Sequence, residues 1–172
     1  MSPPLLAISS TCSNSGKTTL LRSLLPLLRN AGIRVALIKH SHHEIEIDRP
    51  GKDSHALRLA GANPVIITSP QRTALILEHD PEQQPQLAAL LDLLPTGSTE
   101  LILAEGFRHL PLPRIEVFRP SLGRPPLYPN DAQVIAVASD AAAPTAGAPP
   151  WRDLNQPNLI ADFIQHWIAS GG

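Results

Sequence analysis

The 172-residue chain contains a single cysteine, Cys12, and its aromatic residues amount to 3% of the sequence. One cysteine excludes an internal disulfide framework, and the shortage of aromatic side chains argues against nucleic-acid binding by base stacking. The formal net charge is −1, so no excess of positive charge attracts nucleic acid or an anionic membrane. No apolar run is typical of a signal peptide or a membrane span, so we expect a cytoplasmic protein.

Apolar segments and helical patterns alternate along the chain. Hydrophobic residues make up 42% of the sequence, and the length fits one globular domain over residues 1–172. Strands are predicted at residues 5–9, 34–40, 64–68, 73–77, 100–104, 114–119 and 133–138, and helices at 17–30, 53–60, 84–94 and 159–168. Asn155 or Asn158 is expected to cap the last helix. This order predicts an α/β fold with a doubly wound, mostly parallel sheet and an added β-hairpin. Apolar and polar residues alternate over 114–119, which predicts a half-exposed strand.

Residues 11–19 read Thr-Cys-Ser-Asn-Ser-Gly-Lys-Thr-Thr and separate the first predicted strand from the first helix. Strand, glycine-containing turn and helix make the layout of a P-loop, whose backbone N–H groups bind phosphate oxygens. Lys17 would reach the terminal phosphates, and the Thr18 hydroxyl would ligate Mg²⁺. Thr11 stands where the motif usually has a glycine. The loop residues predicted to bind nucleotide are Ser13, Asn14, Ser15, Gly16, Lys17, Thr18 and Thr19.

Charged residues follow several predicted strands, at the sheet edge where parallel sheets bind ligands. Glu105 follows a buried strand and is expected to bind Mg²⁺, which prefers carboxylate and phosphate oxygens. Asp53 is a second candidate ligand, or alternatively the N-cap of the next helix. Asp48 is a weaker candidate for the same role or for orienting a catalytic water. Lys39 ends a strand and could assist catalysis at the transferable phosphate.

Three histidines follow Lys39, namely His40, His42 and His43. They could donate hydrogen bonds to a second anionic ligand together with Lys39 and Arg108, bind a transition metal, or lie in a solvated loop. Asp140 follows the strand predicted at 133–138. Its carboxylate could accept from N1–H and the 2-amino group of guanine, or it could be an ordinary loop residue.

Taken together, these motifs resemble the MobB family, the molybdopterin-guanine dinucleotide biosynthesis adapter proteins of bacteria. The resemblance rests on the loop and on residues 38–43, 50–54, 57–62, 103–107 and 134–140. It implies a homodimer that binds GTP and Mg²⁺ and hydrolyses GTP weakly. It also implies as partners the molybdopterin guanylyltransferase and molybdenum-insertion proteins. If molybdopterin or its guanine dinucleotide is the second ligand, its phosphates would suit Lys39, His40, His42 and Arg108. A distant similarity to dethiobiotin synthetase implies Mg²⁺ ligation by Glu105 and Asp53.

Two other functions stay open at this point. The histidines could serve a metal-insertion GTPase, and a small-molecule P-loop kinase would need an arginine-rich lid, for which residues 108–124 are the candidate. No arginine finger or positioned glutamine is evident, so hydrolysis is expected to be slow. Residues 113–119, flanked by prolines, are predicted to form a subunit contact.

Overall fold

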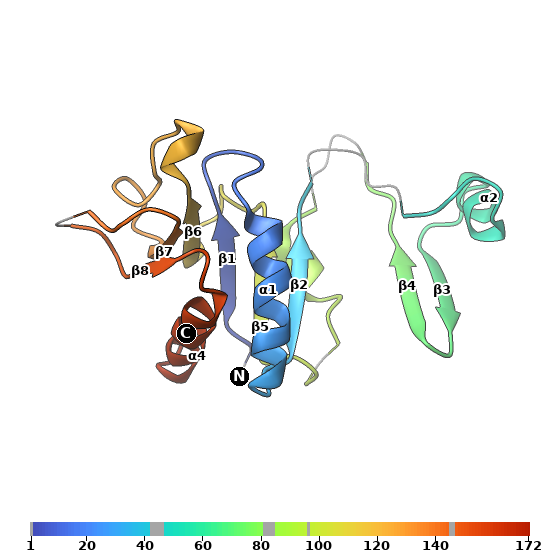
Figure 1. Ribbon diagram of the computed structural model, residues 1–172. Coiled ribbons are helices and arrows are strands. Elements are labelled where there is room, and N and C mark those ends of the chain that lie inside the picture. Colours follow the sequence, from blue (N-terminus) through green and yellow to red (C-terminus); the bar gives the residue numbers. More distant parts are fainter. Residues whose placement is uncertain (1, 42–46, 81–84, 96, 145–146) are drawn as a thin grey trace. The chain divides into compact units, whose positions relative to one another are not determined.

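Six strands form a parallel sheet in the computed structural model, which describes residues 2–41, 47–80, 85–95, 97–144 and 147–172 (Figure 1). Every pairing between neighbouring strands of this sheet is parallel. Its order is β2 (Val35–Lys39), β5 (Leu101–Glu105), β1 (Leu5–Ser9), β6 (Arg114–Phe118), β7 (Val134–Ser139) and β8 (Trp151–Asp153). The predicted α/β fold with a mostly parallel sheet is confirmed.

The chain divides into two compact units, Met1–His40 with Leu94–Gly172, and Ser41–Leu93. The first unit contains the parallel sheet. The single domain expected over residues 1–172 stays a prediction. Among the described residues, no helix is long and apolar enough to cross a membrane.

Two helices of the first unit share one hydrophobic core with the sheet. Helix α1 (Lys17–Asn30) packs against α4 (Pro157–Ala169), as Figure 1 shows. Leucines at helical spacing give α1 a buried face that meets the core residues of the central strands. The members of this face are Leu20, Leu21, Leu24 and Leu28. This packing fixes the start of α1 directly beside the end of β1.

Several element boundaries differ from the sequence prediction. The bounds of β1 and α1 are confirmed, whereas the helix expected at 84–94 is described only as α3 (Leu87–Leu91). Gln156 is the N-cap residue of α4, so the prediction of Asn155 or Asn158 is wrong. Pro157 occupies the first helical position, where its missing N–H costs no hydrogen bond. Strand β8 was not predicted.

Strand β6 corrects the expectation of a half-exposed strand at 114–119. It pairs with β1 on one side and with β7 on the other. Arg114 and Glu116, the polar residues of the alternating pattern, are 2% and 0% exposed. Because both hydrogen-bonding edges of β6 are occupied, the predicted subunit contact through this strand is wrong.

Main-chain oxygens of a neighbouring loop satisfy the buried guanidinium of Arg114. It donates hydrogen bonds to the carbonyls of Arg108 (2.8 Å), Leu110 and Leu112 (3.2 Å). The carboxylate of Asp131 lies 3.5 Å away. These hydrogen bonds compensate for the burial of the Arg114 charge, and they also hold the loop that follows β5.

The Glu116 carboxylate accepts hydrogen bonds from the backbone N–H groups of Leu127 (2.6 Å) and Tyr128 (3.0 Å). Burial raises its pKa above the usual 4.5. Replacing Glu116 by leucine leaves both N–H groups unpaired, so we expect the free energy of unfolding to fall by about 1–3 kcal/mol for each.

The fall in the free energy of unfolding caused by Glu116→Leu should become smaller as the pH rises. Above pH 4.5 the unfolded carboxyl releases its proton while the buried one still holds it, so rising pH favours the unfolded wild type until the raised pKa is passed. The leucine variant lacks this dependence. Urea unfolding of both proteins between pH 4 and 8 measures the difference; a gap that widens with pH contradicts the prediction.

The second unit contains the predicted hairpin, formed by β3 (Val65–Ser69) and β4 (Arg72–Ile76) as a separate antiparallel sheet. It also contains α2 (Asp53–Leu59) and α3. Large apolar side chains of this unit are exposed, among them Leu57 (59%), Leu59 (71%) and Ile66 (65%). Apolar surface of this kind is typical of a contact with another protein surface.

Candidate functional site

The turn between β1 and α1 has the backbone geometry of a phosphate-binding loop. Asn14 has φ 58° and Gly16 has φ 100°, both in the left-handed region. Asparagine and glycine are the residues that adopt this region most readily. Gly16 is the N-cap of α1, so the N-terminus of this helix lies at the loop. The loop can therefore form although Thr11 replaces the usual glycine.

The ammonium group of Lys17 lies among oxygens of this loop. Its Nζ donates to the Ser10 hydroxyl at 2.8 Å, with the Cys12 carbonyl at 3.3 Å and the Ser15 hydroxyl at 3.4 Å. The Ser10 hydroxyl in turn donates to the Cys12 carbonyl at 2.7 Å. These are the acceptors that phosphate oxygens would replace. The sequence analysis missed Ser10, whose one signal is a hydroxyl at the end of β1.

Glu105 and Lys39 meet at the carboxyl ends of adjacent strands. They occupy the same register position of β5 and β2, and Glu105 is also paired with Ile8 of β1, the strand that enters the loop. Lys39 Nζ lies 3.5 Å from Glu105 Oε2, and the Glu105 residue is only 7% exposed. The buried Glu105 carboxylate and the exposed Thr18 at the start of α1 supply oxygen atoms of the kind that Mg²⁺ prefers.

Gly106 packs the chain tightly beside these residues. It has φ 97°, and a Cβ atom added there would lie 2.6 Å from the His40 carbonyl oxygen. The His40 N–H donates to the Glu105 carbonyl at 2.8 Å, and the His40 ring lies 5.5 Å from that of Phe107. The start of the histidine segment is therefore attached to the end of β5.

His42 and His43 lie outside the described residues. Within the described part of the chain, no group of three or more His, Cys, Asp or Glu side chains is placed to hold a metal ion. Arg108 is exposed, and its carbonyl accepts a hydrogen bond from Arg114 at 2.8 Å. The second-ligand role of these residues stays a prediction.

Asp140 follows β7 and is paired with an arginine that the sequence analysis missed. Its Oδ2 accepts a hydrogen bond of 2.6 Å from Nη1 of Arg119. Arg119 directly follows β6, so the rule that examines strand ends would have found it. The predicted strand at 114–119 included Arg119 as its last residue, whereas β6 ends at Phe118.

The candidates Asp48 and Asp53 belong to the second unit. Asp53 is exposed and is the first residue of α2, whose N-cap is Lys52, so the N-cap alternative for Asp53 is wrong. The Asp48 carboxylate accepts from the Ser54 hydroxyl at 2.9 Å and lies 3.6 Å from Arg58 Nε. Asp48 thus has partners within its own unit, and the metal and catalytic roles of both aspartates stay predictions.

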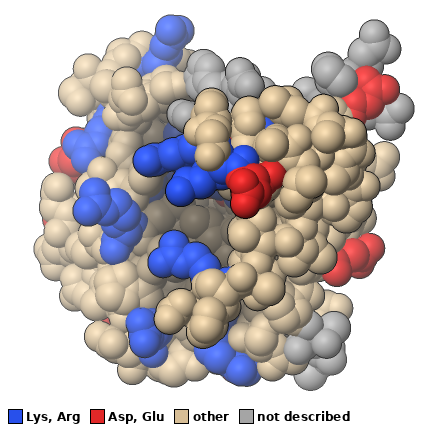
Figure 2. Space-filling model, turned by 90° about the vertical axis from the view of Figure 1, so that its right-hand side faces the viewer, with Lys and Arg blue, Asp and Glu red and all other residues tan. Residues whose placement is uncertain are grey.

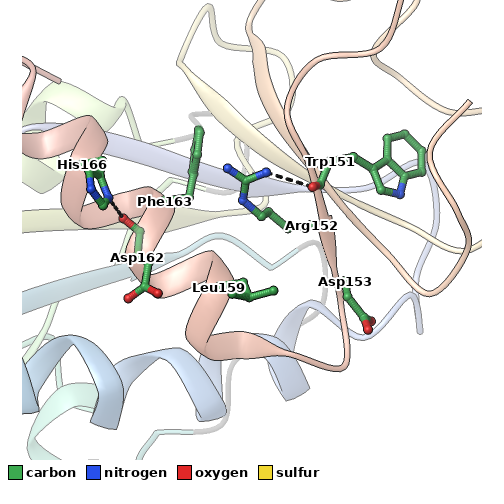
Figure 3. Close-up of a pocket in the computed structure, with 7 residues that line it drawn as sticks. All are labelled: Trp151, Arg152, Asp153, Leu159, Asp162, Phe163 and His166. Carbon is green, nitrogen blue, oxygen red and sulfur yellow. Dashed lines mark hydrogen bonds between the residues drawn. The ribbon is translucent and has the colours of Figure 1, made fainter. Parts of the chain in front are cut away.

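A pocket of about 450 Å³ lies between β8 and α4 and is separate from the loop. Figure 3 shows Arg152 extending toward Phe163, while Trp151 points away from the helix. The Arg152 guanidinium lies 5.4 Å from the Phe163 ring centroid and donates to the Trp151 carbonyl. The pocket lining includes none of the predicted site residues.

Charges of both signs lie on the surface drawn in Figure 2, among residues that are mostly uncharged. Lys and Arg predominate over Asp and Glu on this face, whereas the whole chain has a formal net charge of −1. The expectation that nucleic acid is not a partner stays a prediction from composition.

A parallel sheet whose first strand runs through a phosphate-type loop into a helix defines the P-loop class of α/β proteins, and this chain has that arrangement. A family described as "MobB: Molybdopterin guanine dinucleotide synthesis protein B" matches residues 5–140. The chain belongs to the MobB family.

Two curated relatives carry the name "Molybdopterin-guanine dinucleotide biosynthesis adapter protein". The one from Escherichia coli is 44% identical over 96% of this chain and 93% of its own length, and the one from Haemophilus influenzae is 40% identical over 96% and 89%. A crystal structure of molybdopterin-guanine biosynthesis protein B superposes with a TM-score of 0.71 and 28% identity, covering 95% of this chain and 99% of that one. The structure of Bacillus subtilis MobB superposes with a TM-score of 0.68 at 22% identity, which supports the fold alone.

Proposed function

We propose that this protein is an adapter in molybdopterin-guanine dinucleotide biosynthesis that binds GTP with Mg²⁺ at the P-loop. The observation that carries the proposal is the Lys17 ammonium held among three loop oxygens in a chain of the MobB family. Two relatives named as adapters of this pathway match nearly the whole chain. The relevant partners are then the molybdopterin guanylyltransferase and molybdenum-insertion proteins, in the cytoplasm.

In this proposal Lys17 and the loop amides bind the phosphates, and Asp140 accepts hydrogen bonds from guanine. Thr18 and Glu105 hold Mg²⁺, with Asp53 as a further candidate ligand. When bound, Mg²⁺ neutralises charge on the phosphates. The remaining proposed group, which would bind the phosphates of molybdopterin or its dinucleotide, consists of Lys39, His40, His42, His43 and Arg108.

GTP hydrolysis is expected to be slow. The Arg119 guanidinium is engaged by Asp140 and by the loop carbonyl of Ser15, so it does not act as an arginine finger in this arrangement. An adapter that holds nucleotide beside a second anionic ligand does not depend on fast turnover.

Titration calorimetry with GTP and ATP, with and without Mg²⁺, tests the nucleotide proposal. We expect GTP to bind more tightly than ATP and Mg²⁺ to strengthen binding. The Asp140→Asn variant should lose preference for GTP and gain affinity for XTP, because an amide can donate to the xanthine 2-oxo group. Absence of GTP binding at millimolar nucleotide would overturn the proposal. Co-purification with the guanylyltransferase tests the adapter role independently.

We also propose a homodimer formed through the second unit. Its hairpin has two strands whose outer edges are unpaired in their sheet, and it exposes Ile66, while α2 of the same unit exposes Leu57 and Leu59. Sedimentation should give a dimer at micromolar concentration that Ile66→Glu weakens, with Leu122→Glu, an exposed residue of the first unit, as the control. A monomeric wild type would reject the dimer.

A further inference from the structure

Arg119 reaches from the end of β6 to the phosphate loop. It is the N-cap residue of a short 3₁₀ helix, Pro120–Leu122, with extended backbone. Its Nε donates to the Ser15 carbonyl at 3.0 Å. A Cβ atom added to Gly16 would lie 3.4 Å from Nη2 and 3.5 Å from Nε, so the guanidinium packs against the loop at the residue that begins α1.

The same guanidinium binds Asp140 at the end of β7. Nη1 donates to Oδ2 at 2.6 Å, and the two side chains are 31% and 25% exposed. β1, β6 and β7 are consecutive neighbours in the sheet, so the residues that follow them gather at one edge. One side chain therefore joins the loop to the candidate base-reading carboxylate.

We propose that Arg119 is a positioning residue that couples the phosphate loop to Asp140, so that phosphate affinity and guanine selectivity depend on one guanidinium group. The proposal rests on the proposed function of the P-loop and Asp140 as a GTP site. It names a residue that neither the P-loop motif nor the strand-end carboxylates include.

The contact with Ser15 orients a peptide unit of the loop. A trans peptide is planar, so its C=O and N–H groups point in opposite directions. Holding the Ser15 carbonyl from one side therefore aims the Gly16 N–H to the other side. A donor that is already oriented binds an anion without a cost of reorganisation.

The contact with Asp140 orients the carboxylate, because Arg119 Nη1 donates to Oδ2 at 2.6 Å. A carboxylate has about four lone-pair sites, so Oδ2 can accept from Arg119 and still accept from a base. Other groups fix the backbone that follows: the Ala141 N–H donates to the Ser139 hydroxyl at 3.2 Å, and the Trp151 indole N–H donates to the Ala141 carbonyl at 2.8 Å. Arg119 thus acts on the Asp140 side chain, while the backbone has its own supports.

The test measures dissociation constants for tripolyphosphate, GTP and ATP in wild type, Arg119→Gln and Arg119→Lys. Tripolyphosphate reports the loop alone, and the GTP-to-ATP ratio reports the base site. For Arg119→Gln we expect tripolyphosphate affinity to fall about tenfold and the GTP-to-ATP ratio to fall about tenfold, each from the loss of one charge-assisted hydrogen bond. Lysine keeps the charge but lacks the planar fork, so it should restore one of the two effects at most.

Arg124→Gln is the matched control, because Arg124 is exposed and the described residues give it no hydrogen bond or ion pair. Thermal unfolding of each variant separates loss of binding from loss of fold; if Arg119→Gln is unfolded, Arg119→Lys and the Arg119→Lys/Asp140→Asn pair carry the test. In the double variant, the effects of Arg119→Lys and Asp140→Asn on the GTP-to-ATP ratio should be less than additive.

Arg119 variants that match Arg124→Gln in tripolyphosphate affinity and in GTP-to-ATP ratio overturn the coupling. Asp140→Asn that keeps the wild-type ratio overturns guanine reading by Asp140, and with it the coupling to the base, while tripolyphosphate still tests the loop contact. Wild type that binds neither GTP nor tripolyphosphate overturns the proposed function itself.

Discussion

Replacing Lys17 by methionine should weaken GTP binding by about 10- to 100-fold. The ammonium group lies 2.8 Å from the Ser10 hydroxyl and within 3.4 Å of two further loop oxygens, so it is already directed into the loop that would receive the phosphates. A hydrogen bond between charged groups contributes about 1.5–3 kcal/mol, which accounts for the expected range. Titration calorimetry of both proteins with GTP and Mg²⁺ measures it.

The control is Arg22→Met, on the exposed face of the same helix, which removes the same charge away from the loop. Lys17→Arg should not restore full affinity, because a guanidinium is larger and planar whereas the loop holds a compact ammonium group. Equal GTP affinities in Lys17→Met and Arg22→Met would show that the phosphates bind elsewhere.

The sequence predicted the first strand and the first helix with their observed bounds. Local information is sufficient there, because an apolar strand, a left-handed glycine and a leucine-rich helical face follow one another. β8 was missed because its three residues, Trp151–Asp153, follow a proline-rich stretch and give no periodic signal.

β6 shows where local pattern reasoning fails. Alternating polar residues normally indicate a strand with one face in water. Here the polar side chains of Arg114 and Glu116 are buried, and their partners are main-chain groups of loops before and after the strand. Those partners are brought there by tertiary structure, so the alternation alone could not reveal a buried strand.

The residue that the sequence analysis missed in the candidate site directly follows β6. The strand-end rule selected Lys39 and Glu105, which the structure brings to the same register position. It also selected Asp140 after β7. The same rule applied to β6 leads to Arg119, the residue that contacts both Asp140 and the loop. Without Arg119 the sequence predicts the loop and Asp140 as separate parts of the site. With Arg119 they form a connected group.

Replacing Gly106 by alanine should lower the free energy of unfolding by about 2–5 kcal/mol. The residue has φ 97°, and left-handed backbone costs a residue with a Cβ about 1–2 kcal/mol. The added Cβ would also lie 2.6 Å from the His40 carbonyl oxygen, a backbone atom that cannot rotate away. Overpacking of this kind adds about 1–3 kcal/mol. Urea unfolding of the variant and wild type measures the difference.

Gly32→Ala separates the two contributions, because Gly32 has φ 82° in the same unit and nothing lies within 4 Å of its added Cβ. It should show the backbone cost alone, about 1–2 kcal/mol. If the two variants are equally destabilised, close packing of Gly106 on His40 contributes nothing. Relief of the contact requires the end of β5 to move away from β2, which displaces Glu105 from Lys39. The Mg²⁺-dependent part of GTP affinity should therefore fall in Gly106→Ala and stay unchanged in Gly32→Ala.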